Sequence, residues 1–268
     1  MTAHDRTMVP ISDRSPVLRI QEVDKTFNGG VVALRRFSLT VNKGDFISLL
    51  GPSGCGKSTA LRLIAGLMRP TVGRIQWEGG QGADDLGVVF QEPTLMPWAT
   101  VAKNVWLPFR LRGKSFAAVK DQIMDALSLV GLENFADSYP RELSGGMKMR
   151  VSIARALVTN PRLILMDEPF AALDEMTRQK LNDDLLSLKA RTGATVIFVT
   201  HSVYESVFLS DRIVVMAARP GRVISEIQVD EPYPRGAEWR LSPKYLSTAQ
   251  ETTETLHGAL HPVGGLAE

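Results

Sequence analysis

Residues Leu49 to Leu61 read LLGPSGCGKSTAL, and this stretch constrains the fold of the chain more than any other. An apolar strand runs into a glycine-rich turn, and Lys57, Ser58 and Thr59 then begin a helix. The pattern is G-x-x-x-x-G-K-[ST], a phosphate-binding loop. Its glycines let the backbone N–H groups turn inward, and the helix N-terminus adds a partial positive charge of roughly +0.5. The stretch therefore predicts binding of a nucleoside triphosphate.

The loop residues divide the work of binding between backbone and side chains. Lys57 supplies a full positive charge for the outer phosphates, and the Ser58 hydroxyl is placed to ligate Mg²⁺. Cys55 is the only cysteine, so a disulfide is impossible, and its alkylation is expected to block ATP unless nucleotide is already bound. The expected binding residues are Gly51, Pro52, Ser53, Gly54, Cys55, Gly56, Lys57, Ser58 and Thr59.

Apolar strands alternate with helical patterns along most of the chain. This alternation predicts an α/β fold with a parallel sheet and helices on both faces. Period-2 stretches over 17–27 and 37–41 predict an antiparallel piece before the first buried strand. Buried strands are expected over 46–50, 86–90, 163–166, 195–199 and 212–216, a short strand over 73–80, and helices over about 119–130, 176–190 and 203–209.

Composition suggests three parts. Residues 1–16 are polar and predict a flexible tail, residues 17–230 are expected to form one folded domain with a helical subdomain over about 92–160, and residues 231–268 are expected to be a short peripheral extension. The formal net charge is only +2, so no strong field argues for nucleic acid. No apolar run approaches the roughly 20 residues that span a bilayer. If the protein acts at a membrane, other chains must do the spanning.

Two further motifs carry chemistry. Asp167 and Glu168 end an apolar strand, where the ligands of parallel sheets bind. One carboxylate there can hold Mg²⁺ and the other can orient or deprotonate an attacking water, although a strand exit can also carry plainly solvated acids. Ser144-Gly145-Gly146 precedes a helix and is either a second phosphate-binding device or an ordinary capping turn.

The order of these motifs resembles that of the ATPase subunit of an ATP-binding-cassette (ABC) transporter, over roughly residues 17–228. This resemblance implies a RecA-like P-loop NTPase core, an antiparallel β subdomain and an inserted helical subdomain. The matching motifs are Walker A at Gly51–Thr59, the Q-loop at Gln91, the signature at Leu143–Met147, Walker B at Leu163–Asp167, the D-loop at Ala171–Asp174 and the switch histidine at His201.

The resemblance also implies a mechanism. Two copies of the chain form a head-to-tail homodimer, and each ATP lies between the Lys57 side of one copy and the Ser144, Gly145 and Gly146 turn of the other. The implied catalytic residues are Glu168 as base, His201 at the γ-phosphate and Gln91 at the metal or water, with Mg²⁺ held by Ser58, Gln91 and Asp167. Phe27 stands where the family places an adenine-stacking aromatic, and its alternative role is plain packing. Met147 departs from the frequent Gln but leaves the Ser-Gly-Gly donors intact.

Residues 89–98 and 218–222 resemble the nitrate, sulfonate and taurine group of importers. The chain is then the ATP-hydrolysing subunit of a bacterial importer for such a small solute, peripheral at the cytoplasmic face of the inner membrane. Its partners are integral permease subunits and a periplasmic or extracellular solute-binding protein, with no nucleic acid; Leu95, Met96 and Trp98 either line the permease groove or belong to the core. The alternative is a soluble ABC ATPase acting on nucleic acid or ribosomes. The sequence does not name the transported solute.

Overall fold

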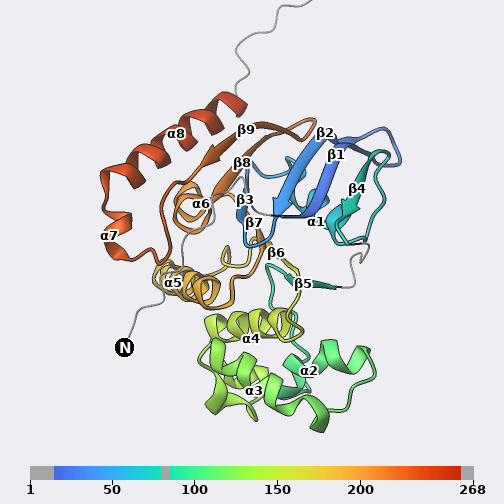
Figure 1. The fold of residues 1–268 in the computed structure, drawn as a ribbon, viewed down its shortest axis with the longest axis vertical. Helices are drawn as coiled ribbons and strands as arrows, with labels where there is room; N and C mark the ends of the chain where they lie inside the picture. The colour runs from blue at the N-terminus through green and yellow to red at the C-terminus, as the bar shows by residue number, and fades with distance from the viewer. Residues whose placement is uncertain (1–14, 80–84, 261–268) are drawn as a thin grey trace, which may run out of the picture.

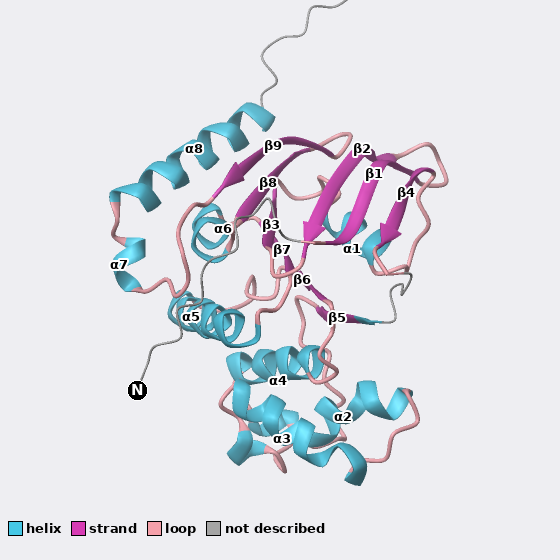
Figure 2. Cartoon of the chain, viewed as in Figure 1, coloured by secondary structure: helices cyan, strands magenta, loops and turns pink. Residues whose placement is uncertain are grey.

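A six-stranded sheet runs through the body of the molecule, which we describe from a computed structural model of residues 15–79 and 85–260 (Figures 1 and 2). The strand order is β5-β6-β7-β3-β8-β9, and only the pair β8–β9 is antiparallel. The strands are β3 (Phe46–Leu50), β5 (Leu86–Val89), β6 (Leu163–Asp167), β7 (Val196–Thr200), β8 (Arg212–Ala217) and β9 (Arg222–Gln228). β3 and β7 are buried at every residue, which explains why their sequences are almost entirely apolar, with only Ser48 and Thr200 as exceptions.

A smaller antiparallel sheet of order β2-β1-β4 lies beside the first. It consists of β1 (Pro16–Thr26), β2 (Val32–Asn42) and β4 (Val72–Trp77). The two sheets meet at Gly221, whose N–H donates to Ala33 O at 3.1 Å and whose carbonyl accepts from Arg35 N at 2.8 Å. A Cβ at Gly221 would lie 2.2 Å from Cys55 O, so only glycine permits this approach. The tail expected over 1–16 lies outside the described residues except for Ser15 and Pro16, and Pro16 already begins β1.

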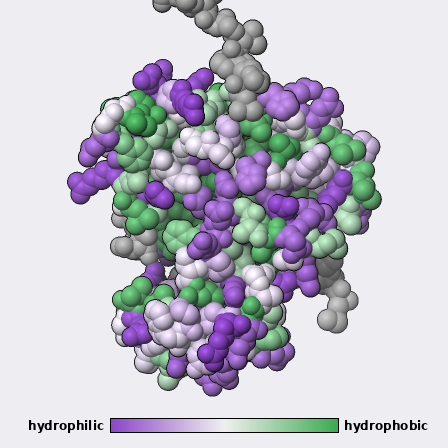
Figure 3. All heavy atoms as spheres, turned by 180° about the vertical axis from the view of Figure 1, so that it is seen from behind, coloured by the Kyte–Doolittle hydropathy of each residue, from purple (hydrophilic) through white to green (hydrophobic). Residues whose placement is uncertain are grey.

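Alternate residues of the central strands enter two separate apolar clusters. Leu163 and Leu165 of β6 pack with β1, β2 and α1 (Lys57–Ile64), whereas Ile164 and Met166 face the other helices. This is the period-2 alternation of a strand with both faces covered. Seen from behind, the outer surface mixes polar and apolar residues over both the body and the helical subdomain (Figure 3).

The helical subdomain projects from one end of the body (Figure 1). Its helices are α2 (Val101–Leu111), α3 (Lys120–Leu129) and α4 (Gly145–Leu157), joined by 3₁₀ turns at Ala117–Val119, Glu133–Phe135 and Pro140–Glu142. Arg150 of α4 donates to Val130 O at 3.3 Å and pairs with Asp184 of α5 (Glu175–Thr192). The subdomain is therefore tied to the body through α4. The parallel core, the antiparallel subdomain and this insertion together confirm the predicted fold class.

Residues 231–268 were expected to form a short peripheral extension, and the structure shows how the described part of this segment packs on the body. Residues 229–260, which we call the C-terminal arm, contain α7 (Ala237–Arg240) and α8 (Pro243–Leu260). The arm packs on α6 (Val203–Leu209) and β8, and buries Trp239, Tyr245 and Thr252. Its polar and Thr-rich sequence conceals this packing, because the buried positions recur only every three or four residues.

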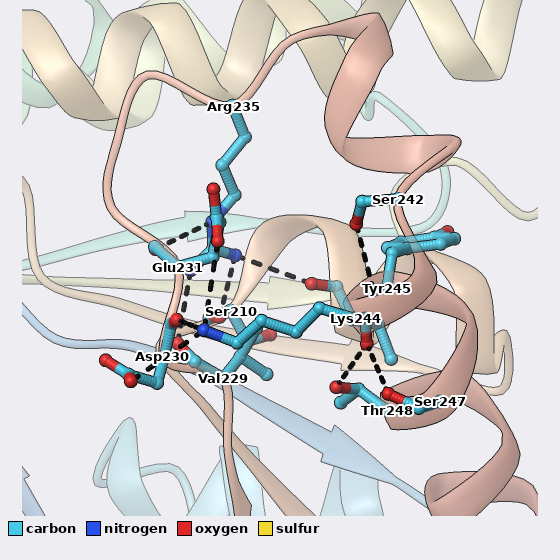
Figure 4. A network of polar contacts seen from close by, with 11 residues as sticks. Ser210, Val229, Asp230, Glu231, Arg235, Ser242, Lys244, Tyr245, Ser247 and Thr248 are labelled. Carbon is cyan, nitrogen blue, oxygen red and sulfur yellow. Dashed lines mark hydrogen bonds and ion pairs between the residues drawn. The ribbon is translucent and has the colours of Figure 1, made fainter.

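Arg235 fixes the start of the C-terminal arm (Figure 4). The residue is 5% exposed, and its guanidinium donates to Phe208 O at 2.9 Å, Ser210 O at 2.8 Å and Glu231 O at 2.7 Å. Two of these carbonyls belong to the end of α6 or follow it directly, where helix carbonyls lack partners of their own. Tyr233 adds a hydrogen bond from its hydroxyl to Leu209 O at 2.7 Å. The C-terminal arm thus caps α6.

Candidate functional site

The phosphate-binding loop joins β3 to α1 and is held in a narrow space. Gly54 and Gly56 have φ values of 75° and 94°, a region that favours glycine. A Cβ at Gly51 would lie 2.7 Å from both Cys55 Sγ and Met216 O. Gly51 and Gly56 leave no room for a side chain, and the φ values of Gly54 and Gly56 would strain any residue that carries one. The backbone of the predicted turn therefore requires these glycines.

Lys57 is the first residue of α1, and its side chain is 4% exposed. Its Nζ donates to Gly51 O at 2.7 Å and to Pro52 O at 3.0 Å, and lies 3.8 Å from Glu168 Oε1. The ammonium is therefore withdrawn from water and held inside the loop by the loop's own carbonyls. Such a buried cation beside inward-facing backbone N–H groups fits the phosphates of a nucleotide.

Ser58 and Asp167 meet across the sheet edge. The Ser58 hydroxyl donates to Asp167 Oδ1 at 3.0 Å, bringing the start of α1 to the end of β6. Burial raises the pKa of Asp167, and the hydrogen bond from Ser58 partly opposes this effect. A hydroxyl and a carboxylate are the hard oxygen donors that Mg²⁺ prefers, with remaining positions left to water and phosphate. The donor set thus fits that ion, although residues 15–79 and 85–260 contain no cluster of three or more His, Cys, Asp or Glu for an all-protein metal site.

Glu168 and His201 form the second pair of this edge. Glu168 Oε2 lies 3.1 Å from His201 Nδ1, and its Oε1 faces Lys57. The backbone of Glu168 has φ of 47°, uncommon for a residue with a side chain, and its N–H donates to Val199 O at 3.0 Å. Such strain is found where the surrounding structure imposes a conformation, often at functional sites. The Glu168 carboxylate therefore meets His201, the residue that directly follows β7.

The predicted residues Ser144, Gly145 and Gly146 lie elsewhere. They form the N-terminus of α4 in the helical subdomain, where Ser144 Oγ accepts a hydrogen bond from Met147 N at 3.3 Å. Ser144 and Gly145 are exposed, whereas a Cβ at Gly146 would lie 2.9 Å from Thr177 Cγ2. No hydrogen bond or ion pair within the described part of the chain links this turn to Lys57 or Glu168. The single chain does not bring its two phosphate-binding devices together.

Gln91 and Phe27 lie at the margins of the site. Gln91 follows β5 and is exposed, with no hydrogen bond to any residue of the described chain. Phe27 follows β1 and is 37% exposed, with Lys25 Nζ 5.5 Å from the ring centroid. The ring is thus partly exposed with a cation above it, and its role in adenine stacking stays a prediction.

The structure adds two features of the site, at Cys55 and Arg155, that the sequence did not predict. Cys55 is fully buried, and burial raises the pKa of its thiol, so the folded chain disfavours the thiolate that alkylation requires; that alkylation of Cys55 blocks ATP stays a prediction. Arg155 of α4 donates to Pro93 O and Thr94 O, both at 2.9 Å, and so holds the segment that follows Gln91. An arginine on a helix gives no sequence signal for such a contact.

Comparison with known proteins agrees with this geometry. A family model described as ABC transporter matches residues 34–171. A nitrate import ATP-binding protein of Synechocystis is 41% identical over 254 residues, covering 90% of this chain and 95% of the relative. An aliphatic sulfonates import ATP-binding protein of Bacillus cereus is 44% identical over 222 residues, covering 81% and 87%. A solved dimer of an ATP-binding cassette in a post-hydrolysis state with ADP and Pi is 34% identical, with a TM-score of 0.69 over 80% of this chain and 100% of the other.

Proposed function

This chain belongs to the ABC transporter family of ATP-binding proteins, and from that premise we propose that it hydrolyses ATP to energise import of a small solute. The observation that carries the proposal is the meeting of four side chains at one sheet edge: Lys57, Ser58 with Asp167, and Glu168. His201 joins them through Glu168. Relatives named for nitrate and aliphatic sulfonate import support a small anionic solute.

The site residues would divide the reaction as follows. Loop N–H groups and Lys57 bind the phosphates, and Phe27 stacks on the base. Glu168 accepts a proton from the attacking water, while His201 holds the carboxylate of Glu168 in place. Mg²⁺, when bound through Ser58 and Asp167 with Gln91 in reach, would neutralise charge on the phosphate oxygens.

Glu168 is oriented before any substrate arrives. One carboxylate oxygen lies 3.8 Å from Lys57 Nζ and the other 3.1 Å from His201 Nδ1. Preorganisation of this kind lowers the entropy that must be lost on reaching the transition state. It supports a hydrolytic role for the site over a role in binding alone.

A second copy of the chain would complete the site. The Ser144, Gly145 and Gly146 turn exposes the N-terminus of a 13-residue helix and reaches no phosphate-binding residue of its own chain. Helix N-termini bind anions. We therefore infer a head-to-tail homodimer in which this turn faces the ATP of the partner, and the dimeric cassette among the structural relatives supports it.

The same proposal extends to the assembly. The chain would bind permease subunits at the cytoplasmic face of the membrane, and a solute-binding protein outside would deliver the solute. None of the helices in residues 15–79 and 85–260 is long and apolar enough to cross a membrane. We further propose that residues 17–230 carry the catalytic unit and that the C-terminal arm stabilises it. A nucleic-acid or ribosome ATPase is disfavoured by the importer names of the relatives and by a net charge of +2.

Glu168→Gln tests the catalytic assignment. The amide keeps the shape of the side chain and a contact with His201 but cannot accept the proton, so ATP binding should persist while turnover falls on the order of 10²- to 10⁴-fold. Unhydrolysed ATP should hold the chain as a dimer, measured by light scattering after gel filtration. Glu251→Gln is the matched control, because Glu251 is an exposed residue of α8, and this variant should behave as wild type. Hydrolysis at the wild-type rate by Glu168→Gln would refute the assignment.

Transport requires a separate experiment. Deletion of the chain should abolish uptake of one small solute, and the wild-type gene, but not Glu168→Gln, should restore it. Uptake of nitrate, alkanesulfonates, taurine and pyrimidines would be compared. Unchanged uptake of all four, with recovery of ribosomes or nucleic acid as the bound partner, would favour the alternative function.

A further inference from the structure

Two hydrogen bonds close around His201 in the turn between β7 and α6. The N–H of Ser202 donates to Thr200 Oγ1 at 2.9 Å, and this hydroxyl in turn donates to Glu205 Oε2 at 2.6 Å. Thr200 is 2% exposed and ends β7, whereas His201 itself is half-exposed. A single hydroxyl thus joins the residues on both sides of His201 to a carboxyl group one turn further along. We call Thr200 and Glu205 the latch.

Glu205 lies in α6 and is held by two hydrogen bonds. Its N–H donates to Ser202 Oγ at 3.3 Å, which caps the helix, and its Oε2 accepts from Thr200. Its other oxygen, Oε1, is buried and has no hydrogen-bond partner in the described residues, and burial raises the pKa of Glu205. Burial of an unpaired carboxyl oxygen opposes folding. Stability alone therefore does not account for a glutamate at this place.

The ring of His201 has little else to hold it. Glu168 Oε2 is its single hydrogen-bond partner in the described structure, and its side chain is 53% exposed. Packing therefore contributes little to the ring orientation. The direction of the ring depends on the backbone of residues 200–202, and that backbone is what the latch fixes.

We propose that Thr200 and Glu205 are positioning residues for His201, acting through the Ser202–Thr200–Glu205 hydrogen bonds to aim its ring at Glu168. The latch forms no hydrogen bond or ion pair with Lys57, Ser58, Asp167 or Glu168 in the described structure, and it acts through His201 alone. It rests on the proposed role of His201 in hydrolysis.

Paired substitutions separate positioning from folding. Thr200→Val keeps the shape and strand preference of threonine but removes the hydroxyl, whereas Thr200→Ser keeps the hydroxyl. Glu205→Ala removes the acceptor, whereas Glu205→Gln keeps an oxygen for Thr200. Small displacements of a reacting group can lower rates by up to about 10²-fold. We expect kcat for ATP to fall roughly 10- to 100-fold in Thr200→Val and Glu205→Ala, and Thr200→Ser and Glu205→Gln to restore most of it.

The Michaelis constant distinguishes positioning from general damage. KM for ATP should stay within about twofold of wild type in all four variants, because neither latch residue forms a hydrogen bond or ion pair with Phe27 or with residues 51–59 of the phosphate-binding loop in the described structure. Thr252→Val is the matched control: Thr252 is fully buried and its hydroxyl donates to Thr248 O at 2.7 Å, remote from the site in α8. It should lower thermal stability but leave kcat unchanged.

Each remaining outcome decides one proposal. Wild-type kcat in Thr200→Val, or equal loss in Thr200→Val and Thr200→Ser, would overturn the latch. If Thr200→Val does not fold, the Glu205→Ala and Glu205→Gln pair decides by the same criterion. His201→Ala is measured alongside: wild-type kcat in that variant would overturn the proposed role of His201. Loss of kcat in His201→Ala together with normal kcat in both latch deletions would overturn the latch alone.

Discussion

Replacement of Arg235 by alanine should destabilise the whole ATP-binding domain. The guanidinium donates to the carbonyl oxygens of five residues, namely Val207, Phe208, Ser210, Val229 and Glu231, over 2.7–3.5 Å. Its Cζ also lies 4.5 Å from the ring centroid of Tyr233. Removal of the side chain would take this donor away from the carbonyls of Phe208 and Ser210 at the end of α6.

The magnitude follows from the number of contacts and their burial. A hydrogen bond to a charged group contributes about 1.5–3 kcal/mol, and several that share one donor are not additive. Water entering the vacated space would recover part of the loss. We expect a destabilisation of about 3–5 kcal/mol, comparable with the loss of one partner from a buried ion pair. In a domain of this size each kcal/mol lowers Tm by about 2–4 °C, so Tm should fall by about 6–20 °C.

Differential scanning calorimetry without nucleotide measures this effect. Arg222→Ala is the matched control, because Arg222 is exposed and donates to Pro220 O at 3.4 Å; its change should stay within about 0.5 kcal/mol. Arg235→Lys should be intermediate, since lysine keeps the charge but not the planar fork. Equal Tm values for Arg235→Ala and Arg222→Ala would refute the reasoning, and the C-terminal residues would then be peripheral.

Two further predictions concern the site. Burial raises the pKa of Asp167 in the folded chain, so the contribution of this carboxyl to stability is full below its unfolded-state pKa and is lost as pH rises through its native pKa. Asp167→Asn should therefore raise Tm at neutral pH without Mg²⁺ or nucleotide, and this gain should disappear in acid. A difference in Tm that does not change with pH would contradict the reasoning. Cys55 should react with iodoacetamide roughly 100-fold more slowly than a cysteine peptide, because the loop must first open; a rate equal to that of the peptide, by mass spectrometry, would contradict its burial.

Strong local patterns predicted much of the fold. The strands expected at 46–50 and 163–166 and the helix expected at about 203–209 agree with β3, β6 and α6 within a residue. The two strands are mostly apolar and the helix has a capping serine, so local chemistry and burial favour the same conformation. The pairings of Lys57 with Glu168 and of Ser58 with Asp167 follow once β6 is placed near β3, since parallel strands end at one edge.

Other features depend on contacts that no local pattern encodes. β9 pairs antiparallel with β8 and exposes most of its residues, so it lacks the apolar run of its neighbours. α8 is rich in Thr and Ser, which form helices poorly, and packing of Tyr245 and Ala249 against the body determines its position. The latch requires a hydrogen bond between Thr200 and Glu205 across a turn, and neither residue type predicts that contact.

The contacts of Gly221 fix the distance between the antiparallel sheet and the phosphate-binding loop. Its backbone lies against Ala33 of β2 and against Cys55 in the phosphate-binding loop, too close on either side for any Cβ. The sheet that carries Phe27 is thereby fixed at one distance from the loop that carries Lys57. A ligand that bridges the two must have the span of a base joined through a sugar to a chain of phosphates. Substitution of Gly221 by any larger residue would reset that span and should shift the preference among ligands of different phosphate length.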